Sequence, residues 1–140
     1  MPHIHTEHWS LEIPDDWQVE HDEETGSVSI SDPDDIGCLD LLVVMSDDKV
    51  EDEALQQFIH DSVVDESLTN LPELVNCDMA AFSGYSLQYV ADGLAWREWY
   101  LADENLVLMV TYNTEKEQAG LDDSMVDQIL ETLVREPAEV

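Results

Sequence analysis

The first third of the chain alternates apolar and polar residues with the period of β-strands. Because successive side chains of a strand point to opposite faces, an apolar residue at every second position predicts a strand with one buried face. Segments 8–13, 17–19 and 28–30 have this pattern, and 38–45, which is almost continuously apolar, predicts a central strand. The alternating apolar residues are Trp9, Leu11 and Ile13, then Trp17 and Val19, then Val28 and Ile30.

The pattern then changes to the helical period of about 3.6 residues. Apolar residues three and four positions apart predict one helix of about four turns from Val50 to near Glu66. A second helix is predicted to begin at Asp122 or Asp123, with Arg135 complementing its C-terminal dipole, and to end at Pro137. The apolar stripes are Val50, Ala54, Leu55, Phe58, Ile59 and Val63, and then Met125, Val126, Ile129, Leu130, Leu133 and Val134.

Between the two helices the pattern returns to strands. Residues 73–82 predict one strand weakly, 84–91 predict another clearly, and the Asp-Gly pair at 92–93 is typical of a hairpin turn. Thr114–Glu117 has the residue types of a capping box, and Gly120 can close that short turn.

The most pronounced strand pattern is at 93–113, where two segments rich in aromatic and β-branched residues flank a polar turn. With the turn centred on Asp103 and Glu104, Leu101 lies opposite Leu106, and both faces of the hairpin carry large apolar side chains. A sheet with one solvated face alternates apolar and polar residues more cleanly. We therefore expect other elements to cover both faces, at least in part.

The order of the elements is strands, helix, strands, helix. The chain of 140 residues is long enough for one domain with a real core and too short for two ordinary domains. We expect a single α+β domain over 1–140. In it, an antiparallel sheet of about six or more strands lies between two helices as an α/β/α sandwich.

The charge restricts the choice of partner. The chain has 34 acidic and 4 basic residues, a formal net charge of -30. Nucleic acid is excluded because phosphate binding needs clustered Lys and Arg, and an anionic membrane surface is disfavoured for the same reason. Basic proteins or cations are favoured, since such a field attracts and steers them. The alternative is that the charge serves solubility or adaptation to a salty cytoplasm.

The sequence predicts a cytoplasmic protein. Its first residues, MPHIHTEHWS, lack the charged and apolar regions of a signal peptide, and no apolar run approaches the roughly 20 residues that span a bilayer. Cys38 and Cys77 are then expected to be reduced and buried, because disulfides are rare in that compartment. Only the loss of a leader would make a disulfide between them worth considering.

Most candidate chemical sites have a structural explanation. His3, His5 and His8 could offer imidazoles to a metal, but no supporting ligand has a recognised spacing, and an exposed terminal segment is the simpler explanation. Segment 32–37 begins like a calcium loop but lacks the required residues at its fifth and twelfth positions, so it predicts an acidic turn. His60 beside Asp61 is interpreted as a helix-surface residue rather than part of a Ser-His-Asp arrangement. No catalytic residue, metal site or cofactor is predicted.

Trp96, Arg97, Trp99 and Tyr100 are the candidate binding residues. Trp and Tyr are favoured at protein interfaces, and an aromatic groove rimmed by acids would suit a basic, amphipathic segment. Alternatively these aromatic residues, with Trp9 and Trp17, belong to the core. For Arg97 we favour a structural role, paired with a carboxylate or stacked on Trp96 or Trp99, over a role in anchoring an anionic ligand.

The order of elements, with three local signatures, resembles the PsbP-like superfamily. The signatures are Ile13-Pro14-Asp15-Asp16-Trp17, the aromatic strand from Trp96 to Tyr100 running into Val107 to Tyr112, and the closing helix from Val126 to Leu133. That superfamily includes the extrinsic P protein of photosystem II, the Ran-binding Mog protein, DcrB lipoproteins and adaptors of type VI secretion effectors. The resemblance implies an antiparallel sheet sandwiched by helices and a non-enzymatic, protein-binding role in a bacterial member of the superfamily.

We therefore expect a small, acidic, non-catalytic module that binds a basic protein as an adaptor, effector chaperone or immunity protein. The alternative function is a small-molecule or metal-binding domain, conceivably a weak enzyme, with a pocket between helix and sheet. A concave site with converging polar groups would favour this alternative.

Overall fold

The computed structural model describes most of the chain. The described residues are 3–6, 8–22, 24–34, 36–64, 74–79, 82–91, 93–121 and 123–135.

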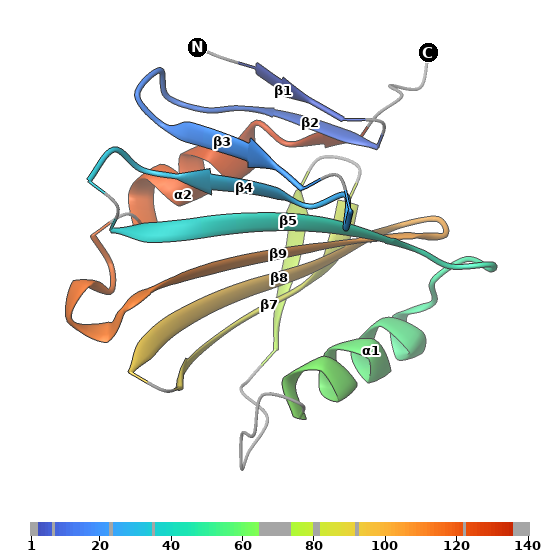
Figure 1. Cartoon of the computed structure of the whole chain (residues 1–140). Coiled ribbons are helices and arrows are strands. Elements are labelled where there is room, and N and C mark those ends of the chain that lie inside the picture. The colour runs from blue at the N-terminus through green and yellow to red at the C-terminus, as the bar shows by residue number, and fades with distance from the viewer. Residues whose placement is uncertain are drawn as a thin grey trace.

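Within these residues the chain folds as an α+β domain with two antiparallel sheets and two α-helices (Figure 1). The large sheet has seven strands in the order β3-β4-β5-β9-β8-β7-β6, and the small sheet has three in the order β1-β2-β10. The large sheet consists of β3 (Gln18–His21), β4 (Val28–Ser31), β5 (Gly37–Met45), β6 (Val75–Met79), β7 (Phe82–Ala91), β8 (Leu94–Asp103) and β9 (Leu106–Glu115). The remaining elements are β1 (His3–His5), β2 (Trp9–Glu12), β10 (Val134–Arg135), α1 (Asp52–Val64), α2 (Asp123–Glu131) and the 3₁₀-helix η1 (Lys116–Gln118).

The two helices cover opposite faces of the large sheet, as the sequence predicts (Figure 1). On the face that we call the α1 face, Leu55 and Ile59 of the helix join a buried cluster with residues of β7, β8 and β9. On the α2 face, α2 and the small sheet together cover the main core. That core includes Val126, Ile129 and Leu130 of α2, Trp9 and Leu11 of β2, and Trp99, Leu101, Leu108 and Val110 of the β8–β9 hairpin.

The strand predictions are confirmed for every segment in which the sequence shows alternation. Residues 37–45 form β5, an interior strand between β4 and β9, as the continuous apolar run predicts. The weakly predicted strand at 73–82 is divided between β6 and the start of β7. Of the described residues, none belongs to a helix long and apolar enough to cross a membrane.

The turn of the β8–β9 hairpin lies one residue later than predicted. It consists of Glu104 and Asn105, and Asp103 pairs with Leu106, so the predicted pairing of Leu101 with Leu106 is wrong. Each residue of β8 therefore pairs with a residue of β9 two positions later than predicted. Because residues two apart on a strand share a face, the side chains still point to the predicted faces.

Contacts with a distant segment account for this turn. Ser46 N donates to Asn105 O at 2.8 Å, and Asn105 Nδ2 donates to Ser46 O at 3.1 Å. Val50 N donates to Glu104 O at 2.7 Å, and Glu104 has φ +54°, a conformation unfavourable for a residue with a side chain. The chain before α1 therefore holds the turn in place.

The second helix is shorter than its apolar stripe predicts. It ends at Glu131, and Val134 and Arg135 form β10 against β2, so their predicted helical positions are wrong. Thr132 Oγ1 donates to Ile129 O at 2.6 Å, and Glu12 N donates to Thr132 Oγ1 at 2.8 Å. These bonds link the end of the helix to the small sheet, where the chain continues as a strand.

The predicted capping box is also wrong. Thr114 lies in β9, and its hydroxyl donates to Ile36 O at 2.6 Å rather than to a helix terminus. Glu115 is the N-cap residue of η1 and makes no side-chain capping bond. Gly120 has φ +92°, which fits the turn-closing role predicted for it.

Some predicted boundaries lie outside the described residues. They are the end of the first helix near Glu66, Asp92 in the predicted turn, Asp122 as the alternative start of the second helix, and Pro137.

Candidate functional site

The hairpin strand β8 separates the four predicted binding residues onto two faces of the sheet. Trp96 and Tyr100 point to the α1 face together with Glu98, whereas Arg97 and Trp99 point to the α2 face. Trp99 is 4% exposed and Tyr100 is 2% exposed, so both contribute to the core, while Trp96 is half-buried. The four residues therefore do not form one continuous surface.

Arg97 has the structural contacts that the sequence predicts. Its Nη2 lies 2.8 Å from Asp127 Oδ1, its Nη1 lies 3.4 Å from Asp123 Oδ1, and its Cζ lies 4.7 Å from the ring centre of Trp99. These contacts attach β8 to α2. The Nε and Nη1 atoms of Arg97 are buried and make no hydrogen bond with the described part of the chain.

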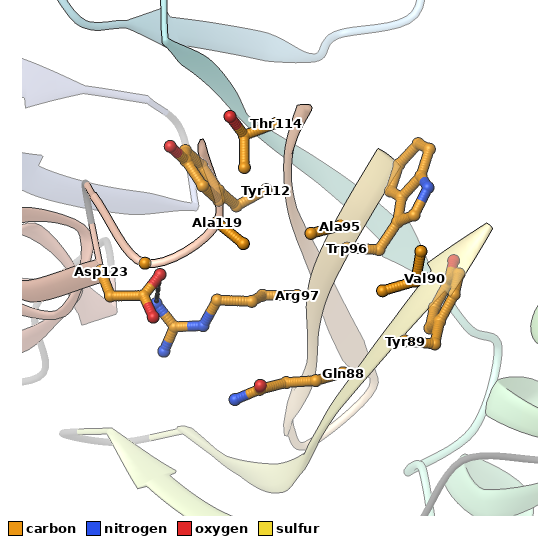
Figure 2. Close-up of a pocket in the computed structure, with 11 residues that line it drawn as sticks. Gln88, Tyr89, Val90, Ala95, Trp96, Arg97, Tyr112, Thr114, Ala119 and Asp123 are labelled. Carbon is orange, nitrogen blue, oxygen red and sulfur yellow. Dashed lines mark ion pairs between the residues drawn. The ribbon is translucent and has the colours of Figure 1, made fainter. Parts of the chain in front are cut away.

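A cavity of about 260 Å³ lies beside the Arg97 side chain (Figure 2). Figure 2 shows Arg97 and Gln88 extending to one side of their strands and the rings of Trp96 and Tyr89 extending to the other. Asp123 lies directly beside the guanidinium, with which it forms an ion pair. Val90, Ala95, Tyr112 and Ala119 are among the apolar residues that line it.

The charges around this cavity restrict what it can bind. Arg97 already has two carboxylate neighbours, Asp123 and Asp127. A bound anion would therefore meet a net negative charge locally as well as in the whole chain. A neutral group that offers both an acceptor and a donor, such as an amide, matches the neighbouring guanidinium and carboxylate better.

A second hollow, of about 370 Å³, lies between α1 and the strands β6 and β7; we call it the α1 cleft. Asp52 and Asp78 place two carboxylates in its lining. Tyr85 Oη donates to Asp52 Oδ1 at 2.5 Å, and Gln56 Nε2 donates to Asp52 Oδ2 at 2.7 Å. The bond to Asp52 raises the pKa of the Tyr85 hydroxyl above its ordinary value. The apolar wall consists of Val50, Leu55 and Ala102.

A buried carboxylate, which sequence reasoning missed, lies on the α1 face. Glu98 is 4% exposed and accepts hydrogen bonds from the hydroxyls of Tyr89 and Tyr100, the latter at 2.5 Å. The sequence contains a signal for this group, because Glu98 and Tyr100 are two residues apart on one strand and so share a face. The bond across to Tyr89 depends on the pairing of β7 with β8.

The histidine and acidic-turn candidates remain structural. His3 and His5 are exposed on β1 with stacked rings 4.2 Å apart, so this segment is a paired strand rather than a loose terminus. No group of three or more His, Cys, Asp or Glu that could hold a metal is found among the described residues. Asp32 is buried and accepts backbone bonds from Ile36 N at 2.8 Å and Gly37 N at 3.1 Å, as expected of an acidic turn.

The remaining candidates also show no catalytic geometry. His60 Nδ1 lies 3.8 Å from Asp61 Oδ1, and both side chains are more than half exposed on α1, as predicted for a helix surface. Cys38 and Cys77 are thiols, but both are half-buried, so the prediction that they are buried is wrong. Burial raises the pKa of the Cys77 thiol, and Asp78 and Asp127 raise it further, which disfavours a reactive thiolate.

Sequence comparison identifies no relative. No protein-family model matches the chain, and no curated protein matches it.

Comparison of structures, in contrast, finds similar folds, and three bacterial proteins are among the matches. A Bacteroides thetaiotaomicron protein has a TM-score of 0.66 at 14% identity, over 94% of this chain and 47% of its own. This chain thus spans about half the length of that protein. Mycobacterium tuberculosis LpqN, which is involved in cell envelope biogenesis, has a TM-score of 0.59 at 16% identity, over 92% of this chain and 83% of its own.

The third structure is cyanobacterial PsbP (CyanoP) from Synechocystis. Its TM-score is 0.61 at 15% identity, over 91% of this chain and 86% of its own. At identities this low, structural similarity establishes a shared fold and nothing about function. The function therefore has to be argued from the site. The chain therefore has the PsbP-like fold that its sequence resembles.

Proposed function

We propose that the chain is a non-catalytic protein-binding module for a basic partner, of the adaptor, effector-chaperone or immunity type, acting in the cytoplasm. The PsbP-like fold is compatible with a non-catalytic module. The observation that carries the proposal is the net charge of -30, with so few basic residues exposed to balance it.

The four basic residues do little to reduce the surface field. Arg97 is engaged by two carboxylates of α2, and Lys49 and Lys116 are exposed. Uncompensated surface charge of one sign raises the association rate of an oppositely charged partner and opposes association of the chain with itself. Both effects suit a module that recognises a basic protein.

The test is capture of proteins from a lysate of the source cells on the immobilised chain, at about 0.05 M and about 0.5 M salt, since screening strengthens over that range. A resin carrying polyglutamate at the same charge density is the control. A basic protein retained at low salt by the chain, and not by polyglutamate, supports the proposal. If both resins retain the same proteins, the chain acts only as an ion exchanger and the proposal fails.

The Arg97 cavity favours a second candidate function, the binding of a small neutral molecule with an amide-like group. A ligand that binds only the native state stabilises it by about 2.7 kcal/mol at about 100 times its dissociation constant. We expect such a ligand to raise the melting temperature of the wild-type chain and to lose this effect in Arg97→Met, which keeps most of the side-chain volume. A stabiliser that acts equally on both chains would place its site elsewhere.

A further inference from the structure

We propose that the free edge of β6 and the adjoining α1 cleft form the docking site for an extended segment of the partner in which Lys or Arg alternates with apolar residues. This inference rests on the proposed function and specifies where and how the basic partner binds.

The first argument is the position of β6. It is the last strand of the large sheet, and among the described residues no strand pairs with its outer edge. Alternate residues of such an edge direct unpaired N–H and C=O groups outward, where an extended segment can add as a further strand. The large negative charge of this chain opposes pairing between two copies along that edge and favours a basic segment.

The second argument is the chemistry of the two faces of β6. Asn76 and Asp78 lie opposite Tyr85 and Ser83 and point to the α1 face, where they line the α1 cleft. A basic residue beside Asp78 in an added strand would form an opposite-charge cross-strand pair.

The α1 cleft suits a long basic side chain. The aliphatic stem of a Lys or Arg can lie along the apolar wall of Val50, Leu55 and Ala102 while its charged end approaches Asp52 and Asp78. α1, β6 and β7 contain no Lys or Arg that would compete for these carboxylates, and Lys49, which precedes Val50 of the cleft wall, is exposed.

The opposite face of β6 suits apolar side chains. Val75 is 55% exposed, and Cys77 is half-buried against the main core. Apolar residues at alternate positions of an added strand would cover Val75. The two faces of β6 together therefore select for alternation of basic and apolar residues.

The other edge of the large sheet, β3, lacks this combination. The hollow beside it is lined by Glu20, His21, Asp22, Glu24, Ser27 and Ser29, with no apolar side chain to hold an aliphatic stem.

The test uses synthetic peptides of alternating Lys and Val, titrated against the chain at fixed salt. Two control peptides have the same residues and net charge. In one, the Lys and Val residues are grouped in blocks; in the other, alternate backbone amides are N-methylated and cannot pair with a strand. We expect the alternating peptide to bind most tightly and to slow the hydrogen exchange of β6 amides.

Matched variants of the chain locate the site. Asp78→Lys should weaken binding of the alternating peptide by about tenfold, as expected when one partner of a close charge pair is lost and replaced by a like charge. Asp61→Lys makes the same charge change on the exposed surface of α1, 69% exposed, and should weaken binding by about twofold or less. Circular dichroism melting verifies that both variants fold, and Asp78→Asn provides a milder change at the same position.

Equal effects of Asp78→Lys and Asp61→Lys, equal binding of the three peptides, or no binding at all would overturn the inference. A partner retained from the lysate under any of these outcomes would leave the proposed function standing without this docking site. Failure of the lysate capture, in contrast, would remove the proposed function itself.

Discussion

The buried carboxylate of Glu98 gives a quantitative prediction about stability. Among the described residues, two of the tyrosine–carboxylate hydrogen bonds have the same length, 2.5 Å, in different environments. Tyr100 donates to Glu98, which is 4% exposed, whereas Tyr85 donates to Asp52, which is exposed on α1. Replacing either tyrosine with Phe removes one hydroxyl and keeps the ring, and each carboxylate keeps one other donor, Tyr89 for Glu98 and Gln56 for Asp52, so burial is the main difference between the two sites.

The expected losses of unfolding free energy differ several-fold. A hydrogen bond to a charged group contributes about 1.5–3 kcal/mol when water cannot replace the lost partner. Because Glu98 is buried, Tyr100→Phe should cost about 2 kcal/mol. In Tyr85→Phe, water can replace the hydroxyl at the exposed carboxylate, and the cost should be about 0.5 kcal/mol. At about 4 °C per kcal/mol for a domain of this size, the melting temperature should fall by about 8 °C and about 2 °C.

Urea unfolding followed by tryptophan fluorescence measures both free energies. Equal losses for the two variants, or a loss below about 0.5 kcal/mol for Tyr100→Phe, would refute the argument from burial. A double-mutant cycle with Glu98→Gln provides the control. The cost of Tyr100→Phe should decrease once the carboxylate is gone, because the hydroxyl then loses only a bond to a neutral group.

Three further predictions concern single positions. Gly84→Ala should destabilise the chain by about 1–3 kcal/mol in urea unfolding, because the new Cβ would lie 1.9 Å from the carbonyl oxygen of Tyr100; an unchanged free energy would mean that β7 and β8 can separate there at little cost. Glu104→Gly should stabilise the chain by about 1 kcal/mol, since Gly adopts φ +54° without steric cost, and a loss of stability would show that the Glu104 side chain makes a compensating contact. The pKa of the Cys77 thiol is higher in the folded chain than in the unfolded chain, so folding favours the neutral thiol. The neutral thiol therefore contributes fully to stability below the ordinary thiol pKa, and this contribution is lost as the pH rises through the pKa of the folded chain. In Cys38→Ser, iodoacetamide at pH about 8 should therefore alkylate Cys77 more slowly in the folded chain than in the urea-unfolded chain, and equal rates would contradict the raised pKa.

The sequence predicted the layers of the fold because each layer leaves a local pattern. Alternation at Trp9 and Leu11 reflects a strand whose apolar face lies on the core, although Ser10 on its other face is buried as well, and the stripe of α1 reflects a helix on a sheet. The errors arise where distant segments decide the local structure. The Glu104–Asn105 turn is fixed by residues before α1, and the end of α2 is fixed by pairing with β2.

The candidate sites were harder to predict, because they depend on which strands are neighbours. Alternation along β8 could have separated Trp96 from Arg97, since adjacent residues of a strand face opposite ways. It could not have placed Asp127 beside Arg97, or Asp52 and Asp78 in one cleft, because these contacts join separate elements. Net charge is the basis on which we propose a basic partner, and only the arrangement of strands could suggest where such a partner would dock.

The small sheet has a consequence for synthesis of the chain. β2 lies between β1 and β10, so a strand that is translated before α1 is paired on one side with a strand that is translated after α2. The strands β6 to β9 pair with their immediate neighbours in the sequence and can form as the chain emerges from the ribosome. Trp9 and Leu11, in contrast, reach their final surroundings only after α2 and β10 have been made. Until then these two apolar side chains are open to chaperones and to other nascent chains, and the addition of α2 and β10 completes their burial.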